Sequence, residues 1–394
     1  MITQIDISNF RSIKQQSIPL KKLNILYGPN GSGKSSVMYA PYVMRNFFVN
    51  PNQRIDNLFN LGFINLGGVQ NVISSSKSYP GVDIRISLNL SKLNLYPYRF
   101  PAIDSFFTFN LFLPDYRSGA DIEIKNGVNI GKIEFDLPYN LTTKQEIQIN
   151  NEKLLWNGLT FDNISDSGVS QDIRNAYNKA FEAVKCFEII SVRRGFFSPI
   201  FSTEQANEEA LFAMQIRNEG TNFESKIDYY FKQIFNKTFR FVAIPGSTSF
   251  YLRTQNPKGI TVDLVNEGFG VNQTLYMLIK LLKKNTSLAF IEEPEIHLHP
   301  SAQKKLVDVF AEIVEKENKQ IFLSTHSENI VSSVLTKIAE GELSKDDVQF
   351  YLAKGENDET KVIPQEVNDK GQIEGGLMSF METELSNLKV LLGL

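Results

Sequence analysis

The chain has 394 residues, a formal net charge of −3 at pH 7, 42% hydrophobic and 22% charged residues, and one cysteine, Cys186. This length allows two or three packed units, and the charge excludes a protein that coats nucleic acid through bulk electrostatics, although not one with a local basic groove. A single cysteine excludes disulfide frameworks and cysteine zinc sites within one chain, and the lack of a signal-peptide pattern or a membrane-length apolar run predicts a cytoplasmic protein without membrane contacts.

The first elements of the chain lead into a phosphate-binding motif. Residues 2–7 alternate like a strand, and the apolar run 23–27 predicts a buried strand. Residues 28–35 read Gly-Pro-Asn-Gly-Ser-Gly-Lys-Ser and match G-x-x-x-x-G-K-[ST]; residues 36–40 can begin a helix, which Pro41 is expected to limit. This strand–loop–helix context predicts a P-loop, and the alternative is a glycine-rich turn that matches by chance.

A P-loop predicts binding of a nucleoside triphosphate, which we expect to be ATP with Mg²⁺. The glycines let successive backbone N–H groups turn toward the phosphates, and the helix N-terminus adds its positive dipole end. Lys34 would reach the β- and γ-phosphates, and the Ser35 hydroxyl would hold Mg²⁺. The loop residues predicted to bind the nucleotide are Asn30, Gly31, Ser32, Gly33, Lys34, Ser35 and Ser36.

The middle of the chain has the pattern of an inserted, mainly antiparallel β lobe. Alternating apolar residues and an Asn126-Gly127 hairpin signal predict strands over 84–90, 106–113, 121–125, 128–135 and 146–150. Apolar stripes predict helices over 171–185 and 223–235, with strands at 187–192, 239–244, 250–253 and 260–265. We therefore divide the chain into 1–80 and 241–394, the two parts of an α/β nucleotide domain, and 81–240, the inserted lobe.

The C-terminal third completes the nucleotide domain. Its patterns predict helices over 275–282, 302–316, 329–339 and 377–392, and strands over 287–291, 320–324, 348–353 and 361–367. Glu292 and Glu293 follow the apolar strand 287–291, as in a Walker B motif: Glu292 would contact Mg²⁺ and Glu293 would orient the attacking water. The usual first residue is Asp, so Glu292 departs from the pattern, and the alternative is a pair of surface acids.

One histidine is placed to sense a γ-phosphate. His326 follows the strand 320–324, and the carboxyl ends of neighbouring parallel strands meet at one crevice. It could hydrogen-bond the γ-phosphate or the attacking water, although a lone histidine is more often structural or solvated. We therefore predict Glu293 and His326 as the catalytic residues.

These motifs together resemble a known family. Residues 9–13, 292–300 and 324–327 resemble the opening motif, the Walker B and D-loop, and the switch histidine of ABC-type, AAA-family ATPases of the branch that includes RecF, SMC and the overcoming-lysogenization-defect ATPases. The resemblance covers residues 1–75 and 260–394, and it assigns Arg11 to the nucleotide site. The tail, with Gly371-Gln372-Ile373, resembles a short C-terminal domain of unknown function found in many bacterial ATPases of this type.

Two parts of the family pattern are altered here. The signature loop is best matched by residues 267–273, which lack the usual serine, and Gly270 and Asn272 would face a γ-phosphate across a dimer. The alternative for this segment is an ordinary glycine-rich helix cap. For the Q-loop, which would contact Mg²⁺, the candidate is Gln70.

The resemblance implies a homodimer, or a higher homo-oligomer, that closes around two ATP molecules and opens after hydrolysis. The chain lacks both the coiled coil of SMC proteins and the acidic cluster of a nuclease module, so no intrinsic nuclease is expected. The first functional interpretation is the ATPase switch of a bacterial anti-phage defence system with a separately encoded effector protein. The alternatives are a RecF-like DNA-repair ATPase that clamps DNA, and a slowly hydrolysing ATP-dependent scaffold.

Two surface features complete the predictions. Basic residues gather only in pairs, namely Arg193-Arg194, Lys283-Lys284 and Lys304-Lys305, so any DNA groove would have to be assembled by folding or dimerisation. Aromatic residues crowd the segment 96–113, which we predict to contribute to a protein–protein contact. These aromatic residues are Tyr96, Tyr98, Phe106, Phe107, Phe109 and Phe112.

Overall fold

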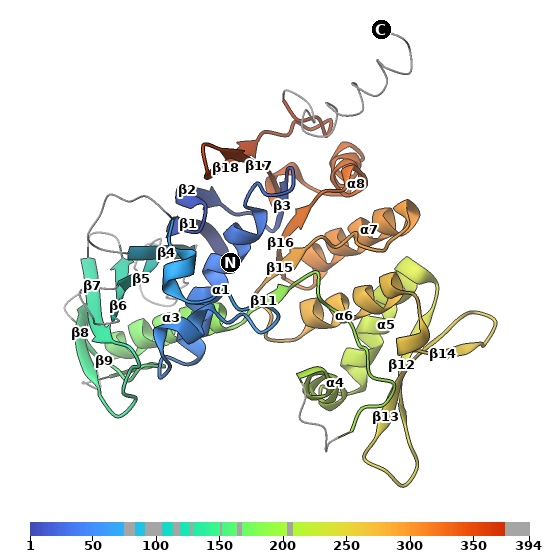
Figure 1. Ribbon diagram of the computed structural model, residues 1–394, viewed down its shortest axis with the longest axis horizontal. Helices are drawn as coiled ribbons and strands as arrows, with labels where there is room; N and C mark the ends of the chain where they lie inside the picture. Colours follow the sequence, from blue (N-terminus) through green and yellow to red (C-terminus); the bar gives the residue numbers. More distant parts are fainter. Residues whose placement is uncertain are drawn as a thin grey trace.

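The computed structural model describes residues 1–74, 83–90, 105–112, 119–126, 129–149, 152–163, 168–202 and 208–374. The fold is α/β, as predicted, with a central mixed sheet, a six-stranded antiparallel sheet beside it, and two three-stranded sheets (Figure 1). The predicted helix over 377–392 lies outside the described residues. Within these ranges, no helix is both long enough and apolar enough to span a membrane.

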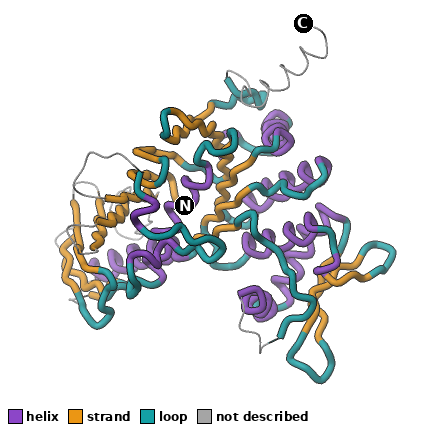
Figure 2. Tube along the Cα trace, viewed as in Figure 1, coloured by secondary structure: helices purple, strands orange, loops and turns teal. Residues whose placement is uncertain are grey.

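The central sheet brings together strands from both ends of the chain, and it runs through the middle of the molecule (Figure 2). Its first five strands are parallel and β18 is antiparallel to β17. In spatial order the strands are β11 (Phe187–Ile190), β15 (Leu288–Glu292), β16 (Gln320–Thr325), β3 (Leu23–Tyr27), β17 (Val348–Glu356) and β18 (Glu359–Gln365).

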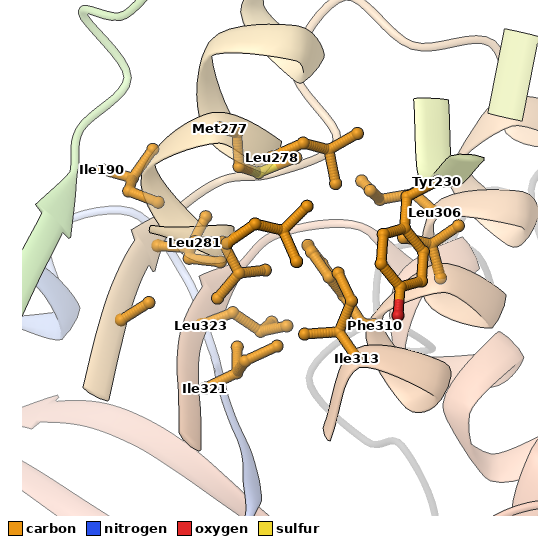
Figure 3. Packing of buried hydrophobic residues seen from close by; sticks show 14 of the residues in the cluster. Ile190, Tyr230, Met277, Leu278, Leu281, Leu306, Phe310, Ile313, Ile321 and Leu323 are labelled. Atoms are coloured by element: carbon orange, nitrogen blue, oxygen red, sulfur yellow. The ribbon is translucent and has the colours of Figure 1, made fainter. Parts of the chain in front are cut away.

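The inner strands β3, β15 and β16 are buried at every residue, which explains why they are apolar runs rather than alternating ones. In β15, Leu288 and Phe290 belong to one core cluster, while Ala289 and Ile291 belong to the other. Figure 3 shows the second cluster, where Leu323 of β16 lies near side chains of the helices that cover this face. The sheet therefore separates two hydrophobic cores, and its carboxyl edge is left for polar chemistry.

The helices divide between the two faces. Residues of α1 (Lys34–Val49) and α3 (Gly168–Lys185) belong to the first core, and the helices that follow in the chain belong to the second. α1 continues through Pro41 to Val49, so the expected early limit was wrong; residues 36–44 are all buried, and packing on both sides offsets the hydrogen bond that proline removes. The helices of the second core are α4 (Glu208–Asn218), α5 (Thr221–Phe235), α6 (Phe269–Leu282), α7 (Pro300–Lys316) and α8 (Glu328–Ala339). The chain also has a one-turn helix, α2 (Val69–Val72).

The predicted inserted strands extend a sheet that the N-terminus begins. The order β2-β1-β4-β5-β6-β7 places β4 beside β1, and all five pairings are antiparallel. Neither β2 nor the sheet β10-β9-β8 was fully predicted: β2 is mostly polar and exposed, and β8, β9 and β10 have at most five residues each. The bounds are β1 (Ile2–Phe10), β2 (Ile13–Pro19), β4 (Asp83–Leu90), β5 (Ser105–Phe112), β6 (Gly119–Asn126), β7 (Asn129–Asp136), β8 (Gln145–Ile149), β9 (Glu152–Trp156) and β10 (Phe161–Asn163).

The segment 81–240 is not confined to one region of the fold. Its strand β11 pairs in parallel with β15 of the central sheet, and its helix α5 packs against α6 and α7. The strands β4–β10 and α3 lie together on one side of the molecule, where β4–β7 continue the sheet that β1 and β2 begin (Figure 1). The remaining sheet, on the opposite side of the molecule, is formed by β12 (Thr238–Ala243), β13 (Phe250–Gln255) and β14 (Thr261–Asp263).

Phe109 is the one residue of the predicted aromatic interface whose side chain lies among the described residues. Phe109 is fully buried, and its ring stacks on that of Phe47 of α1 with 4.6 Å between centroids. Phe109 therefore anchors the N-terminal sheet to α1 rather than facing a partner. Tyr96 and Tyr98, and the side chains of the other aromatic residues in this segment, lie outside the described residues.

Glu188 of β11 joins the central sheet to α6 through a buried charge cluster. Its carboxylate lies 2.8 Å from Lys283 Nζ and 3.6 Å from Lys280 Nζ. Burial alone would raise the pKa of Glu188, but the two lysines outweigh it and hold this pKa below its usual value of 4.5. The ionised carboxylate therefore stabilises the fold above about pH 4.5 and stops doing so as the pH falls through the lowered pKa.

Replacing Glu188 with Gln should lower the free energy of unfolding by about 1–3 kcal/mol at pH 7, because two partly buried ammonium groups lose their partner. Denaturant unfolding at pH 7 and pH 3.5 measures this effect, and the difference from the native chain should shrink at the lower pH. Glu315→Gln on α7, for which no ion pair is found among the described residues, is the matched control. An equal loss at both pH values would contradict the charge argument.

Candidate functional site

The carboxyl ends of β3, β15 and β16 open onto a cavity of about 490 Å³. The cavity brings together side chains that the sequence spreads over 316 positions, from Arg11 to His326. Its lining is mostly polar and consists of Arg11, Ser12, Asn30, Gly31, Gly33, Lys34, Ser35, Ser36, Tyr39, Val192, Glu292, Glu293, Ser324 and His326. This set includes most of the predicted site residues.

Contacts with the C-terminal strands constrain the shape of the P-loop. Gly33 has φ of 88°, a left-handed conformation, and a Cβ at this position would lie 1.9 Å from the Thr360 hydroxyl of β18. Thr360 is itself held by Ser12, with 2.7 Å between the two hydroxyl oxygens. Glycine is therefore required at the last loop position by close contact with the C-terminal hairpin as well as by the turn.

The Lys34 side chain donates hydrogen bonds to its own loop. Its ammonium group donates to the carbonyl oxygens of Gly28, at 3.0 Å, and Pro29, at 2.9 Å, and the residue is only 7% exposed. Burial lowers the pKa of Lys34 to about 8, against the opposing pull of Glu293 and Glu295. Beside it, the buried Ser32 hydroxyl has no hydrogen-bond partner among the described residues. The Lys34 ammonium group, bonded to carbonyl oxygens, and the Ser32 hydroxyl, which has no partner in the described part of the chain, are both suited to binding phosphate oxygens.

Two of the three predicted metal ligands, Ser35 and Glu292, are joined by a residue that the sequence analysis missed. The Tyr39 hydroxyl on α1 donates to Glu292 Oε1 at 2.9 Å and also hydrogen-bonds Ser35. Burial, together with Glu292, holds the pKa of Tyr39 well above its usual value, so the phenol stays protonated. No three acidic, histidine or cysteine side chains of the described residues gather as a metal site. Ser35 and Glu292 would thus supply two oxygen ligands to Mg²⁺, which commonly takes the rest from phosphates and water.

Glu293 and His326 face each other across the cavity. His326 Nε2 lies 3.2 Å from Glu293 Oε1, and both side chains are 31% exposed. Burial and the neighbouring Lys34 lower the pKa of His326 below 6.5 even though Glu293 raises it, so the ring is neutral at pH 7. Glu293 has φ of 43°, which is uncommon for a residue with a side chain. The pair lines the same cavity as Lys34 and Ser35 of the P-loop.

Glu295 organises the turn that carries His326. Its Oε1 accepts hydrogen bonds from the Thr325 hydroxyl at 2.6 Å and from the backbone N–H groups of His326 at 2.9 Å and Ser327 at 3.2 Å. Burial raises the pKa of Glu295 against the effect of these bonds. The D-loop resemblance contained this residue, but its task depends on a contact between two loops that no local pattern reveals.

Arg194 was predicted in a basic pair on the surface, and the structure places it in the interior. The side chain is 2% exposed and donates to three backbone carbonyls: Ser191 at 3.0 Å, Glu292 at 2.6 Å and Glu293 at 2.8 Å. Burial lowers the pKa of Arg194 to about 10. Arg193 is exposed, while Lys283 is engaged by Glu188. Of the three predicted basic pairs, only Lys304-Lys305 is exposed at both of its residues.

Four predicted site residues do not line the cavity: Ser32, whose hydroxyl is buried in the P-loop, and Gly270, Asn272 and Gln70. Gly270 is buried in the first turn of α6, where a Cβ would approach the His297 carbonyl to 2.4 Å. Asn272 is 3% exposed, and its amide group donates to the carbonyls of Phe196, at 2.7 Å, and Leu264, at 3.2 Å. These bonds contradict its predicted role as a phosphate donor. Gln70 is exposed on α2 and does not line the cavity.

The fold has relatives among solved structures. The chain aligns with an Smc head bound to the C-winged helix domain of ScpA, at 12% identity and a TM-score of 0.54, over 92% of this chain and 97% of that one. It also aligns with an Smc head domain with an extended coiled coil bound to the C-terminal domain of ScpA derived from Pyrococcus furiosus, at 11% identity and a TM-score of 0.51, over 92% and 96% of the two chains. These similarities establish the fold of an SMC ATPase head.

Comparison of sequences identifies a relative and a family. A protein of Helicobacter pylori (strain ATCC 700392 / 26695) described as an ATP/GTP phosphatase is 20% identical over 375 residues, which cover 93% of this chain and 95% of that protein. Residues 23–332, well over half of the chain, match the family described as "AAA domain, putative AbiEii toxin, Type IV TA system". This match includes the P-loop, both carboxylates and His326. The chain therefore belongs to this AAA-domain family of P-loop ATPases.

Proposed function

We propose that this chain hydrolyses ATP in the cavity at the carboxyl ends of β3, β15 and β16. We also propose that nucleotide binding switches the chain between monomer and dimer. The observation that carries this proposal is the Glu293–His326 pair, 3.2 Å apart and on the same cavity as Lys34, Ser35 and Glu292. A carboxylate beside a neutral imidazole at the phosphate end of a P-loop has the chemistry needed to handle a water molecule.

Each residue has a separable task. Lys34 leaves the carbonyls of its loop and pairs with the β- and γ-phosphates. Ser35 and Glu292 would hold Mg²⁺, which would neutralise phosphate charge. Glu293 accepts the proton of the attacking water as general base. The neutral His326 ring donates its Nε2 hydrogen to Glu293 and so holds that carboxylate in one orientation. Arg11, on the cavity wall and 5.8 Å from the Tyr39 ring centroid, adds a cation beside the phosphates.

The switch would act through the first turn of α6. Phe269 in this turn is 62% exposed, and its ring lies 5.6 Å from that of His297, which follows the Walker B carboxylates. Such an exposed aromatic residue at a helix N-terminus suits a contact with the nucleotide-bound face of a second copy. We propose that two chains close around two ATP molecules in this way, and that the closed dimer controls a separately encoded effector in an anti-phage system.

The experiment that tests the chemistry is the replacement of His326 with Ala. It should lower the turnover number for ATP by about 10²-fold, because Glu293 loses the group that orients it, while the affinity for ATP changes little. Phosphate release and fluorescent-nucleotide titration measure the two quantities. His299→Ala, which removes an exposed histidine at the start of α7, should keep native turnover. Native turnover in the His326 variant would remove the pair from the mechanism.

A further inference from the structure

One short segment touches both the catalytic carboxylates and the helix proposed to meet a second chain. Residues 191–196 follow β11 and cross the carboxyl edge of the central sheet beside β15. At one end of this segment, Arg194 donates to the backbone carbonyls of Glu292 and Glu293. At the other end, Phe196 is bonded to Asn272 of α6. No sequence motif assigns a task to this segment.

Arg194 forms hydrogen bonds with backbone carbonyls, and not with a carboxylate of any described residue. Its guanidinium donates only to carbonyl oxygens, at 2.6–3.0 Å, and Nε has no partner among the described residues. Two of the three carbonyls belong to Glu292 and Glu293, where β15 ends and the chain turns, and the third belongs to Ser191. Glu293 follows this turn in the left-handed conformation, with φ of 43°, which a non-glycine residue adopts only when its surroundings impose it. The direction of the Glu293 side chain depends on that conformation.

The contacts of Asn272 fix the other end of the segment. Asn272 Oδ1 accepts from the Phe196 N–H at 2.8 Å, and Nδ2 donates to the Phe196 carbonyl at 2.7 Å, so one side chain satisfies both backbone groups of one residue. Gly195 lies between the two anchors, where a Cβ would come 3.1 Å from Asn272 Oδ1. A shift of the first turn of α6 would therefore be transmitted over two residues to Arg194.

We infer that Arg194 is a positioning residue: it sets the orientation of Glu293 for hydrolysis, and through Phe196 and Asn272 it links that orientation to the position of α6. This inference rests on the proposed hydrolysis at Glu293. According to this inference, β15, Arg194 and α6 form a connected path. When a second chain docks on α6, this path changes the rate at which the first chain hydrolyses its bound ATP. Arg194 touches no substrate, so its effect appears in turnover and not in ATP binding.

The test compares Arg194→Ala with Arg193→Ala, a matched control in which the neighbouring exposed arginine is removed. Arg194→Ala should lower the turnover number by about 10²-fold, with an ATP dissociation constant within about threefold of native. Added guanidinium ion at low millimolar concentration should restore part of the turnover in Arg194→Ala and none in Glu293→Gln. Arg193→Ala should behave as native. Native turnover in Arg194→Ala, or an equal loss in Arg193→Ala, would overturn the inference.

Two milder variants cover the case in which Arg194→Ala does not fold. Arg194→Lys keeps a cation but can satisfy fewer carbonyls, so its turnover should fall at least tenfold with native ATP affinity. Asn272→Asp keeps the acceptor for Phe196 and loses the donor, and its loss should not add to that of Arg194→Lys in the double variant, since both act along one route. Additive losses would overturn the link to α6. If Glu293→Gln itself turns over ATP normally, the proposed function fails, and this outcome is separate from a failure of Arg194.

Discussion

Glu293→Gln is expected to bind ATP as tightly as the native chain and to hydrolyse it at least about 10³-fold more slowly. The amide has the size of the carboxylate and can still face His326 Nε2, which lies 3.2 Å from Glu293 Oε1. It cannot accept a proton from water, and a positioned general base contributes about 10²–10⁴ to a rate. Single-turnover phosphate release measures the chemical step apart from product dissociation.

The same variant tests the switch, because a chain that cannot hydrolyse ATP should remain closed. Light scattering with ATP should give twice the mass of the monomer for Glu293→Gln and the monomer mass with ADP. The trapped form is also the best bait for the effector: a partner recovered with ATP-bound Glu293→Gln and not with the native chain in ADP would support effector control. Turnover at the native level would show that Glu293 is not the base.

Lys34→Ala is expected to weaken ATP binding at least about a hundredfold. The ammonium group is the one cation buried within the P-loop among the described residues, and it already lies beside the loop carbonyls in a site with little exposure. Its charge-assisted bonds to phosphate oxygens are lost in the variant, and this loss exceeds that of an exposed pair. Isothermal calorimetry with ATP and Mg²⁺ gives the affinity directly.

A control for this variant is a lysine that lies outside the site. Lys354→Ala removes an exposed lysine of β17, outside the cavity, and should leave ATP affinity unchanged. Circular dichroism should show that Lys34→Ala keeps the native fold, because the hydrogen bonds that its Nζ donates to the Gly28 and Pro29 carbonyls stay within the loop. Native ATP affinity in a folded Lys34→Ala protein would contradict the assignment of residues 28–35 as a P-loop.

The sequence was most informative where function depends on neighbours along the chain. The strand, loop and helix around Lys34 follow one another within 27 residues, so the pattern predicted both the elements and the chemistry. The same holds for β15 and its two carboxylates. Their apolar strands are buried on both faces, and this burial gives the continuous runs that made them visible.

Prediction failed where a residue's task depends on a distant contact. Asn272 looked like a free amide at a glycine-rich turn, but α6 begins at Phe269, and the amide is used by Phe196, 76 positions earlier. Arg194 looked like half of a basic pair, yet its guanidinium binds carbonyls 98 and 99 positions away. Tyr39 carried no signal at all, since a tyrosine in an apolar helix is the ordinary pattern of a core residue. A burial pattern can be predicted from a sequence, but the partner of a buried polar group cannot.

The position of β3 also determines when the nucleotide site can form during synthesis. This strand is residues 23–27, yet its two neighbours in the sheet are β16 and β17, and Asn24 is bonded to a carbonyl 297 positions later. At about 5–20 residues per second, the strand leaves the ribosome on the order of 15–60 s before either neighbour exists. An apolar strand with two unpaired edges is a target for chaperones and for aggregation. A chain that stops before residue 348 lacks β17, so one edge of β3, the strand that leads into the P-loop, is still unpaired.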